Sequence, residues 1–512
     1  MPAARMLVAV AAIFVVGAVA RAQKPNEGML ELTVTDGPDG PPVACRIHIA
    51  NQAGAARRAT GMPFWHDHFV CPGQVAFTYP KGQYTLLLER GPEYADHSGY
   101  FVMQSFSKDT KTIHLKRAVD MAAEGWWSGD LHVHRRVQEI ELFMRADDLH
   151  VAPLVTWSNA SGREKASGGT SEKQADEPPA QPVVRFDTNR YYDRSAGEDR
   201  RAGGDLLFFR LPKSLELPSV KANEPTTSQV IAEARAAGGG VWIDAATPWS
   251  WDLPLWLAAD GINSIEIINE QFGRTAMSKQ PIVGRLPPGP KPSANDAGQQ
   301  LGAWSQQIYH HVLNCGLRLP PSAGSGTGEG PNHLGYNRTY VWVDRDEFDY
   351  AAWWDGFGRG RVVVTNGPLI RPLANGHLPG HVFTLSAGES VAIDIAMNMA
   401  IREPVRYMEV IHDGRLAQSI RLDDWAKTGH FPPITVDAPG WFLVRVVTDA
   451  KGTYRFASSA PWYVEVADGT RRISRKSVQF FLTWLEERAL QLGAAPEAQK
   501  FWQGLLDRAN AD

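Results

Sequence analysis

The chain has 512 residues, of which 43% are hydrophobic, 21% are charged and 10% are aromatic, and its formal net charge is −4. This length exceeds what one hydrophobic core usually serves, so we expect about three domains. A slight acidic excess without a long basic run excludes nucleic acid from the expected partners.

The first 22 residues have the features of a secretory signal. Arg5 supplies a positive charge, the run from Met6 to Ala20 is apolar, and "ARA" at 20–22 has the small-x-small form of a cleavage site. An uncleaved anchor is the alternative, although this run is short for a membrane span. We therefore expect a secreted or periplasmic protein with no membrane span after signal cleavage.

Residues 27–118 are predicted to form an N-terminal β-sandwich. The segments "MLELTVTD" and "VACRIHIA" alternate apolar and polar residues, and Gly/Pro turns separate them. Cys45 and Cys71 both fall here. In an oxidising compartment they could form a disulfide, and the sequence leaves the bridged and unbridged alternatives open, with Cys315 left over. His66 and His68, in "FWHDHF", are interpreted as structural or surface residues.

Residues 124–345 alternate between two kinds of segment. Strand-like runs such as "DLLFFRL", "GGVWIDA" and "INSIEIIN" are interspersed with helix-like runs such as "TSQVIAEARAAG". This alternation predicts parallel βαβ units, in which ligands gather at the carboxyl ends of the strands. The polar segment 160–182 is predicted to be a surface loop, and a lid is one role open to it.

The remaining chain is predicted to form two further parts. Residues 355–470 are rich in strand-like runs, such as "SVAIDIAM" and "WFLVRVVTDA", and should form a C-terminal β-sandwich. Residues 474–512 have an amphipathic helical pattern, with Ser474 as a cap and Gly493 as a stop.

The segment 125–136, "GWWSGDLHVHRR", contains the strongest candidate for a metal site. In a strand, residues two apart face the same way, so Asp130, His132 and His134 would share one face. Two imidazoles and a carboxylate suit zinc, manganese or iron. Such an ion would lower the pKa of a bound water and activate it at neutral pH.

The motif "GDLHVHR", opening a strand/helix region that follows a β-module, resembles the first motif of the PHP superfamily of metal-dependent phosphoesterases. More narrowly, the chain is similar to secreted CehA/McbA-like metallohydrolases. The segments "ELFMRADDLHVAPLVTWSN", "GGGVWIDAATPWSWDLPLWLA" and "SAGSGTGEGPNHLGYNRTYV" follow in the expected order, and the similarity covers roughly residues 28–468. The resemblance implies a distorted β/α barrel, here flanked by two β-sandwiches, that hydrolyses phosphoester or other ester-like bonds.

Several ligand motifs of this family are altered in the chain. Trp157 and Ser158, in "TWSN", stand where ligands would be expected, and "GGGVWIDAATP" offers Asp244 but no histidine. Gly326, in "AGSGTGEG", occupies an aspartate position. Two histidines and an aspartate can hold one ion, whereas a larger cluster would require Asp244 or other carboxylates.

Further polar residues have two interpretations each. Glu139 either folds back to the metal or is a solvated helix residue, and one of Asp147 and Asp148 could orient a histidine or face solvent. Glu266 and Asn269, in "SIEIINEQF", end a strand and suit either the site or a packing role. Trp249, Trp251 and Trp256 are interpreted as wall and core, with contact to a ligand as the alternative.

The predicted site therefore has a metal set and a catalytic set. His132, His134, Asp130 and Asp244 are the predicted ligands, and Asp130, Asn337 and Arg338 are the predicted catalytic residues. Arg338 could bind a phosphate or carboxylate, or be paired within the scaffold. Two functions follow: a metal-dependent hydrolase with a small-molecule or polymer-end substrate, or a degenerate PHP-like protein that binds a glycan or cell-surface ligand without turnover.

Overall fold

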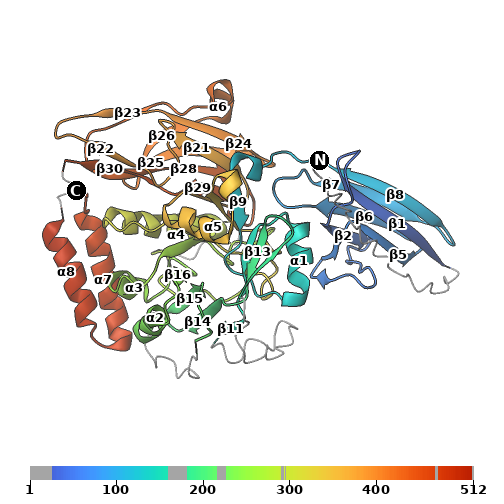
Figure 1. Ribbon diagram of the computed structural model, residues 1–512, viewed down its shortest axis with the longest axis horizontal. Helices are drawn as coiled ribbons and strands as arrows, with labels where there is room; N and C mark the ends of the chain where they lie inside the picture. The colour runs from blue at the N-terminus through green and yellow to red at the C-terminus, as the bar shows by residue number, and fades with distance from the viewer. Residues whose placement is uncertain are drawn as a thin grey trace, which may run out of the picture.

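The computed structural model describes residues 26–158, 182–215, 227–289, 293, 296–467 and 471–509. The predicted signal at 1–22 lies outside the described residues, as does nearly all of the predicted loop at 160–182. The chain has a mixed α/β fold, in which the described residues form eight α-helices and several sheets (Figure 1). None of the described helices is both long enough and apolar enough to cross a membrane.

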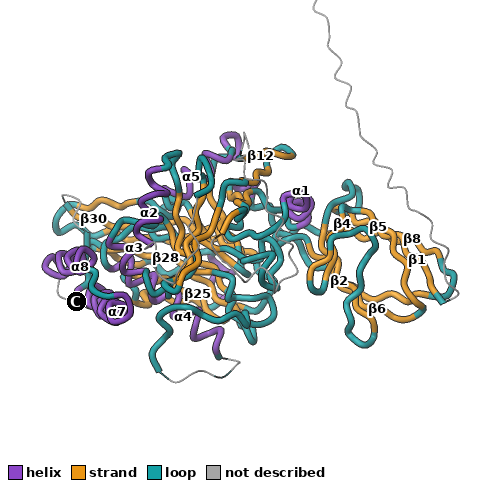
Figure 2. Tube along the Cα trace, turned by 90° about the horizontal axis from the view of Figure 1, so that it is seen from below, coloured by secondary structure: helices purple, strands orange, loops and turns teal. Residues whose placement is uncertain are grey.

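The N-terminal module consists of two facing sheets and lies to one side of the rest of the molecule (Figure 2). One sheet has the order β5-β1-β8: β5 (Gln74–Pro80), β1 (Glu27–Asp36), β8 (Lys108–Leu115). The other has the order β3-β4-β2-β6-β7: β3 (Phe64–Trp65), β4 (His68–Cys71), β2 (Cys45–Asn51), β6 (Gly82–Glu89), β7 (His97–Met103). The alternation read from the sequence buries every second residue of β5, so the apolar face closes a core between the sheets.

The central region contains a six-stranded sheet. Its order is β11-β14-β15-β16-β17-β18: β11 (Trp157–Ser158), β14 (Gly197–Arg201), β15 (Gly204–Phe209), β16 (Trp242–Ala245), β17 (Ser264–Ile268), β18 (Pro321–Ala323). Strands β16, β17 and β18 are parallel, as the alternation of segments predicts. Helix α2 (Thr227–Ala236) precedes β16, and α3 (Leu253–Ala258) and α4 (Ala297–Asn314) connect β16 to β17 and β17 to β18. Over the described strands this sheet keeps two edges, so it is not a closed barrel.

A second, twelve-stranded sheet joins the central and C-terminal regions. Its main path is β12 (Val183–Phe186), β13 (Arg190–Asp193), β10 (Val151–Pro153), β9 (Trp126–Gly129), β19 (Arg338–Trp342), β20 (Val362–Thr365), β29 (Phe456–Ser459), β28 (Gly440–Thr448), β25 (Val405–His412) and β26 (Arg415–Ile420), and β30 (Trp462–Val466) and β22 (Val382–Leu385) lie off it. Strands β19 and β20 pair across the boundary expected between residues 345 and 355. Both are buried runs, and such runs satisfy their backbone groups only by pairing.

The C-terminal strands complete a second core, which lies at the top of Figure 1. Two small sheets pack onto the large one: β21 (Leu369–Ala374) with β24 (Ile395–Ala400), and β23 (Val391–Ile393) with β27 (Ile434–Val436). The other helical elements are η1 (Ala122–Glu124), α1 (Val137–Ala146), η2 (Arg345–Glu347), α5 (Tyr350–Gly358) and α6 (Leu422–Thr428).

The helical tail packs on the central region rather than standing alone. It comprises α7 (Arg475–Leu492) and α8 (Pro496–Arg508), and Ser474 caps α7 by accepting the amide of Ser477, as predicted. Arg488 pairs with Asp252 at 2.6 Å, and the indole of Trp502 donates to Pro254 O at 3.0 Å. These buried contacts hold both helices against α3.

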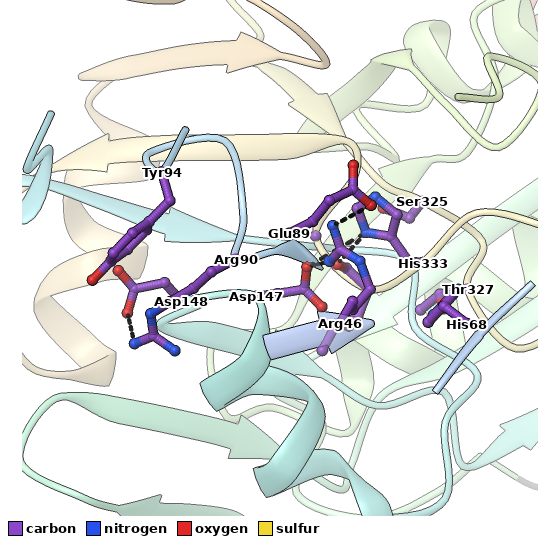
Figure 3. Close-up of polar contacts among 12 residues, drawn as sticks. Arg46, His68, Glu89, Arg90, Tyr94, Asp147, Asp148, Ser325, Thr327 and His333 are labelled. Carbon is purple, nitrogen blue, oxygen red and sulfur yellow. Dashed lines mark hydrogen bonds and ion pairs between the residues drawn. The ribbon is translucent and has the colours of Figure 1, made fainter. Parts of the chain in front are cut away.

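A buried ion-pair network holds the N-terminal module against the segment that follows α1 (Figure 3). Arg46 contacts Asp147, and Arg90 contacts Asp148 at 3.3 Å. Arg117 and Arg190 also reach Asp148, at 2.8 and 2.6 Å. Three guanidinium groups therefore converge on one carboxylate, so Asp148 links the module, the connecting segment and the central region.

Candidate metal centre

His132 and His134 lie just beyond the end of β9, in a segment that the backbone fixes on both sides. Val133 forms isolated parallel bridges to Leu154 and Thr327, and the amide of His134 donates to Thr327 O at 2.8 Å. The two imidazole rings stand 5.1 Å apart, centre to centre. The local backbone thus projects both rings together, although the regular strand has ended at Gly129.

Glu198, on β14, completes a set of three possible ligands with the two histidines. Its Oε1 lies 3.4 Å from His132 Nε2, and its Oε2 lies 3.6 Å from His134 Nε2. Ligands held at about 2.0–2.2 Å around a tetrahedral ion are separated from one another by about 3.4 Å. The spacing of these atoms therefore suits a single divalent ion.

A further carboxylate stands behind each histidine. Glu266 Oε2, on β17, lies 3.5 Å from His132 Nδ1, and Glu329 Oε1 lies 3.5 Å from His134 Nδ1. Both rings thus present Nε2 to Glu198 and Nδ1 to another acid. Metal-binding histidines commonly have a carboxylate on the second ring nitrogen, which fixes the ring and raises its basicity.

The polar atoms at the centre of this group are buried without hydrogen bonds. Both ring nitrogens of His132 and both carboxylate oxygens of Glu198 and Glu266 have no hydrogen-bond partner within the described part of the chain. Glu198 and Glu266 are fully buried, and His132 is 1% exposed. Glu198 has one cationic partner, Arg200, at 2.7 Å. Because burying the other groups without hydrogen bonds is costly, the donor set fits a cation bound among them.

Burial and the neighbouring acids shift the pKa values of these groups in different directions. Burial lowers the pKa of His134 to about 4, so this ring is neutral and able to bind a metal at pH 7. Burial also opposes the charged form of His132, but the carboxylates of Glu266 and Glu198 raise its pKa well above the usual value. Burial raises the pKa of Glu266 to about 8.

We expect the affinity of this site for a divalent ion to rise between about pH 5 and pH 8. At the lower pH, His132 and Glu266 both hold protons, since both pKa values are raised. The ion must displace the proton of His132, and binding becomes easier as these groups deprotonate. Calorimetric titration with Zn²⁺ at several pH values measures the effect, and an affinity independent of pH would contradict it.

Arg200 enters the same site from β14, two residues after Glu198. Its Nε lies 2.7 Å from Glu198 Oε2, and its Nη1 lies 2.5 Å from Glu329 Oε2. Its Nη2 is also 3.4 Å from His134 Nε2. The guanidinium supplies a positive charge to Glu198 and Glu329. It therefore neutralises part of their negative charge and competes with a metal ion for Glu198.

The glycine-rich loop 324–330 closes over the histidines. A Cβ atom at Gly324 would overlap Glu266 and His132, and one at Gly328 would overlap the carbonyl of His134. Gly326 and Gly328 have φ angles of +60° and +104°, which few other residues adopt. Glycine is required here because the backbone passes directly against the ligand side chains.

The carboxylate of Asp130 points to this loop rather than to the two imidazole rings. Its Oδ1 accepts the amides of Ser325 and His132, at 2.9 and 3.2 Å, and its Oδ2 accepts the amide of Gly335 at 2.7 Å. Since β9 ends at Gly129, the strand face that would have aligned Asp130 with His132 does not extend this far. The carboxylate holds the loop in place, which gives its predicted roles as ligand and catalyst no support.

The other predicted ligand and catalytic residues also bind the scaffold. Asp244 accepts hydroxyl groups of Ser264 and Ser322, at 2.7 and 2.8 Å. Asn337 donates to Gly324 O and Asn269 O, at 2.7 and 2.9 Å. Arg338 donates to three backbone carbonyls, those of Gly335, Asp147 and Asp148. None of these contacts involves the two histidines, so the alternative of a scaffold role is the one that fits Arg338.

The remaining candidates have definite positions as well. Asp147 and Asp148 pair with arginines of the interface (Figure 3). Glu139 lies half-buried in the first turn of α1. Trp157, in the altered motif, donates to Ser195 O and packs on Phe208.

The second histidine pair belongs to the supporting module. His66 is exposed, whereas His68 is buried and contacts Asp67 at 3.0 Å. His48, Asp67 and His68 lie near enough to hold an ion. Arg274, however, contacts Asp67 at 3.4 Å and the adjacent Glu89 at 3.0 Å. These acids already have a positive partner, which agrees with the structural interpretation of His68.

Sequence reasoning missed Glu198 and Glu329 and left Glu266 undecided. Glu198 lies in "GEDRR", a strand so rich in charge that its sequence indicates a solvent-exposed turn. The sequence did carry one signal for this residue: Glu198 and Arg200 are two apart, so in a strand they lie on the same face and can pair. Glu329 follows the glycine-rich loop, and only the folding of that loop brings it to His134.

Comparisons with known proteins identify no relative. No protein-family model and no curated protein matches the chain. Among solved structures, the Bacillus anthracis TIE protein is 20% identical over 22% of this chain and 20% of its own, with a TM-score of 0.15. The N-terminal four Ig domains of Dscam1 isoform 7.44 are 7% identical over 87% of this chain and 73% of their own, also with a TM-score of 0.15. The chain thus spans about a fifth of the TIE protein, and similarities this low indicate neither a shared fold nor a shared function.

Proposed function

We propose that the protein is a metal-dependent hydrolase that cleaves phosphoester or other ester-like bonds. The observation that carries this proposal is the meeting of His132, His134 and Glu198, whose facing atoms lie 3.4 and 3.6 Å apart. Glu266 adds to it, because its buried oxygens have no hydrogen-bond partner among the described residues and a bound cation would stabilise its charged form. Zinc, manganese and iron all suit this mixture of imidazole and carboxylate.

The arrangement of strands supports a PHP-like distorted barrel around this site. The edges of the six-stranded sheet are β11 and β18. Leu154, shortly before β11, and Thr327, shortly after β18, both bridge to Val133 between the two histidines. The histidine segment would then fill the gap between the edge strands β11 and β18 of an incomplete barrel. It would lie at the ends of the strands, where barrel folds bind ligands.

The residues of the chain have separate tasks in this proposal. His132, His134 and Glu198 would hold the ion, which would supply Lewis-acid activation of water at neutral pH. Glu266 and Glu329 would orient the two rings. Glu270, two residues after β17, is the candidate proton carrier: its side chain lies against Gly326 of the glycine-rich loop, its buried Oε2 has no hydrogen-bond partner among the described residues, and burial raises its pKa.

The alternative is a PHP-like protein that binds a glycan or cell-surface ligand without turnover, and the position of Arg200 favours it. The guanidinium lies 2.7 Å from Glu198 and 2.5 Å from Glu329, so it could replace the charge of a lost metal. In that case Arg200→Gln would destabilise the fold by removing the cation. In the hydrolase, the same change would strengthen metal binding by releasing Glu198.

Elemental analysis of the purified protein, beside a His132→Ala/His134→Ala variant, tests the proposal. We expect about one equivalent of zinc, manganese or iron in the first protein and none in the second. The metal-loaded protein should then hydrolyse chromogenic phosphomonoesters, phosphodiesters or carboxylic esters, and a chelator should abolish the reaction. If neither protein retains metal after exposure to each ion, the hydrolase proposal fails and the binding alternative stands.

A further inference from the structure

Cys45 and Cys71 lie directly opposite each other in the N-terminal module. Strands β2 and β4 are antiparallel, and their register pairs these two residues. Both side chains are fully buried in the core between the two sheets. Cys315 belongs to a different core, that of the central region, so it is not a partner for either of them.

The backbone geometry of this pair suits a covalent bond. Directly opposed residues of an antiparallel pair have Cα atoms about 4.5 or 5.5 Å apart, and both values fall within the roughly 4.4–6.8 Å range of disulfides. The side chains of the two cysteines are close enough for the Cys45 thiol to lower the pKa of Cys71. The amide of Gly73 also donates to Cys71 Sγ, at 3.3 Å. The two cysteines, which are free thiols in the structure, are therefore neighbours in a register that a disulfide can join.

We propose that Cys45 and Cys71 form a disulfide as the N-terminal module folds, with a small disulfide such as glutathione disulfide as the oxidant. The Cys71 thiolate attacks the oxidant, which forms a mixed disulfide and releases one glutathione thiolate. The Cys45 thiolate then attacks the Cys71 sulfur, which forms the protein disulfide and releases the second glutathione. Each cysteine loses its proton, and the two electrons pass to the oxidant.

Burial determines when the bond forms. Both thiols are inaccessible in the folded module, so an oxidant must reach them during folding or after local opening. Oxidation should therefore be fast in refolding protein and slow in folded, reduced protein.

The bond would stabilise the strands that meet the central region. Arg46, next to Cys45, contacts Asp147, and Val70, next to Cys71, packs with residues of α1. A disulfide constrains the unfolded chain between the joined residues, here the segment 46–70. It would thus fix the surface of the module that faces the α1 segment.

The test is to refold the reduced full chain in a glutathione/glutathione disulfide buffer and count thiols in denaturant. We expect one free thiol per chain, on Cys315, and three after reduction, with peptide mapping that joins the Cys45 and Cys71 peptides. Cys315→Ser should leave no free thiol, and Cys45→Ser should leave two. If Cys45→Ser does not fold, the Cys315→Ser variant and the map still decide. Three free thiols after refolding, or a bond to Cys315, would overturn the proposal.

Discussion

Replacing Glu198 with glutamine is expected to eliminate stoichiometric metal binding. Glu198 supplies both oxygens that face the histidine Nε2 atoms, and an amide offers one neutral oxygen in their place. Loss of an outer partner of a metal site already lowers affinity by about 10- to 100-fold, so we expect loss of this ligand to cost more than 100-fold. Metal content after gel filtration and calorimetric titration measure the change.

Glu139→Gln is the matched control for this experiment. Glu139 follows the histidine segment closely but lies half-buried on α1. It was the alternative carboxylate near the motif, and the same chemical change there should leave metal content unaltered. Retention of metal by Glu198→Gln would show that Glu198 is not a ligand. Loss of metal in Glu139→Gln would favour a Glu139 that folds back to the ion.

Asp148→Asn is expected to destabilise the protein by about 3–5 kcal/mol, the usual effect of breaking a buried ion pair. The change leaves the guanidinium groups of Arg90, Arg117 and Arg190 around a neutral side chain. The Asp148 side chain is only 6% exposed, and those of Arg90 and Arg190 are 8% and 13% exposed, so water compensates little for the lost charge. Urea unfolding followed by tryptophan fluorescence measures the loss.

The exposed pair of Asp355 and Arg359 provides the control. Its atoms are 3.0 Å apart, comparable to the buried pairs, but each side chain is 59% exposed. Exposed pairs contribute little, so Asp355→Asn should change stability by no more than about 0.5 kcal/mol. Equal effects of the two variants would show that the convergence of arginines on Asp148 does not hold the module in place.

The same ion pairs predict how stability depends on pH. Burial opposes ionisation of Asp148, but the nearby arginines, with His150, hold its pKa well below its usual range. Asp148 therefore binds a proton near pH 4 in the unfolded chain but stays ionised at that pH in the folded protein. The contribution of Asp148 is fully present above about pH 4 and is lost as the pH falls below it. Asp148→Asn should reduce this acid sensitivity.

Local pattern was enough to predict the kinds of element, because alternation and helical periodicity reflect which side chains are buried. The N-terminal β-module, the parallel strands β16 to β18 and the cap at Ser474 agree with it. The sequence predicted a domain boundary near residues 345–355. In the structure one sheet crosses this boundary, because β19 and β20 pair with each other, and no local pattern indicates which strands will pair. Changes in composition divide the chain in sequence order, whereas the strands of a sheet can come from any part of the chain.

For the candidate site, the sequence by itself determined the pair His132 and His134, because residues two apart in an extended segment face the same way. Only the tertiary structure decided their partners. It brought Glu198 to Nε2 of both rings and Glu266 to Nδ1 of His132, and it turned Asp130 toward the amides of the loop. The physical reason is that a carboxylate binds whichever donors or cations the fold presents to it. That choice depends on where β14, β17 and the glycine-rich loop meet, which no local stretch of sequence encodes.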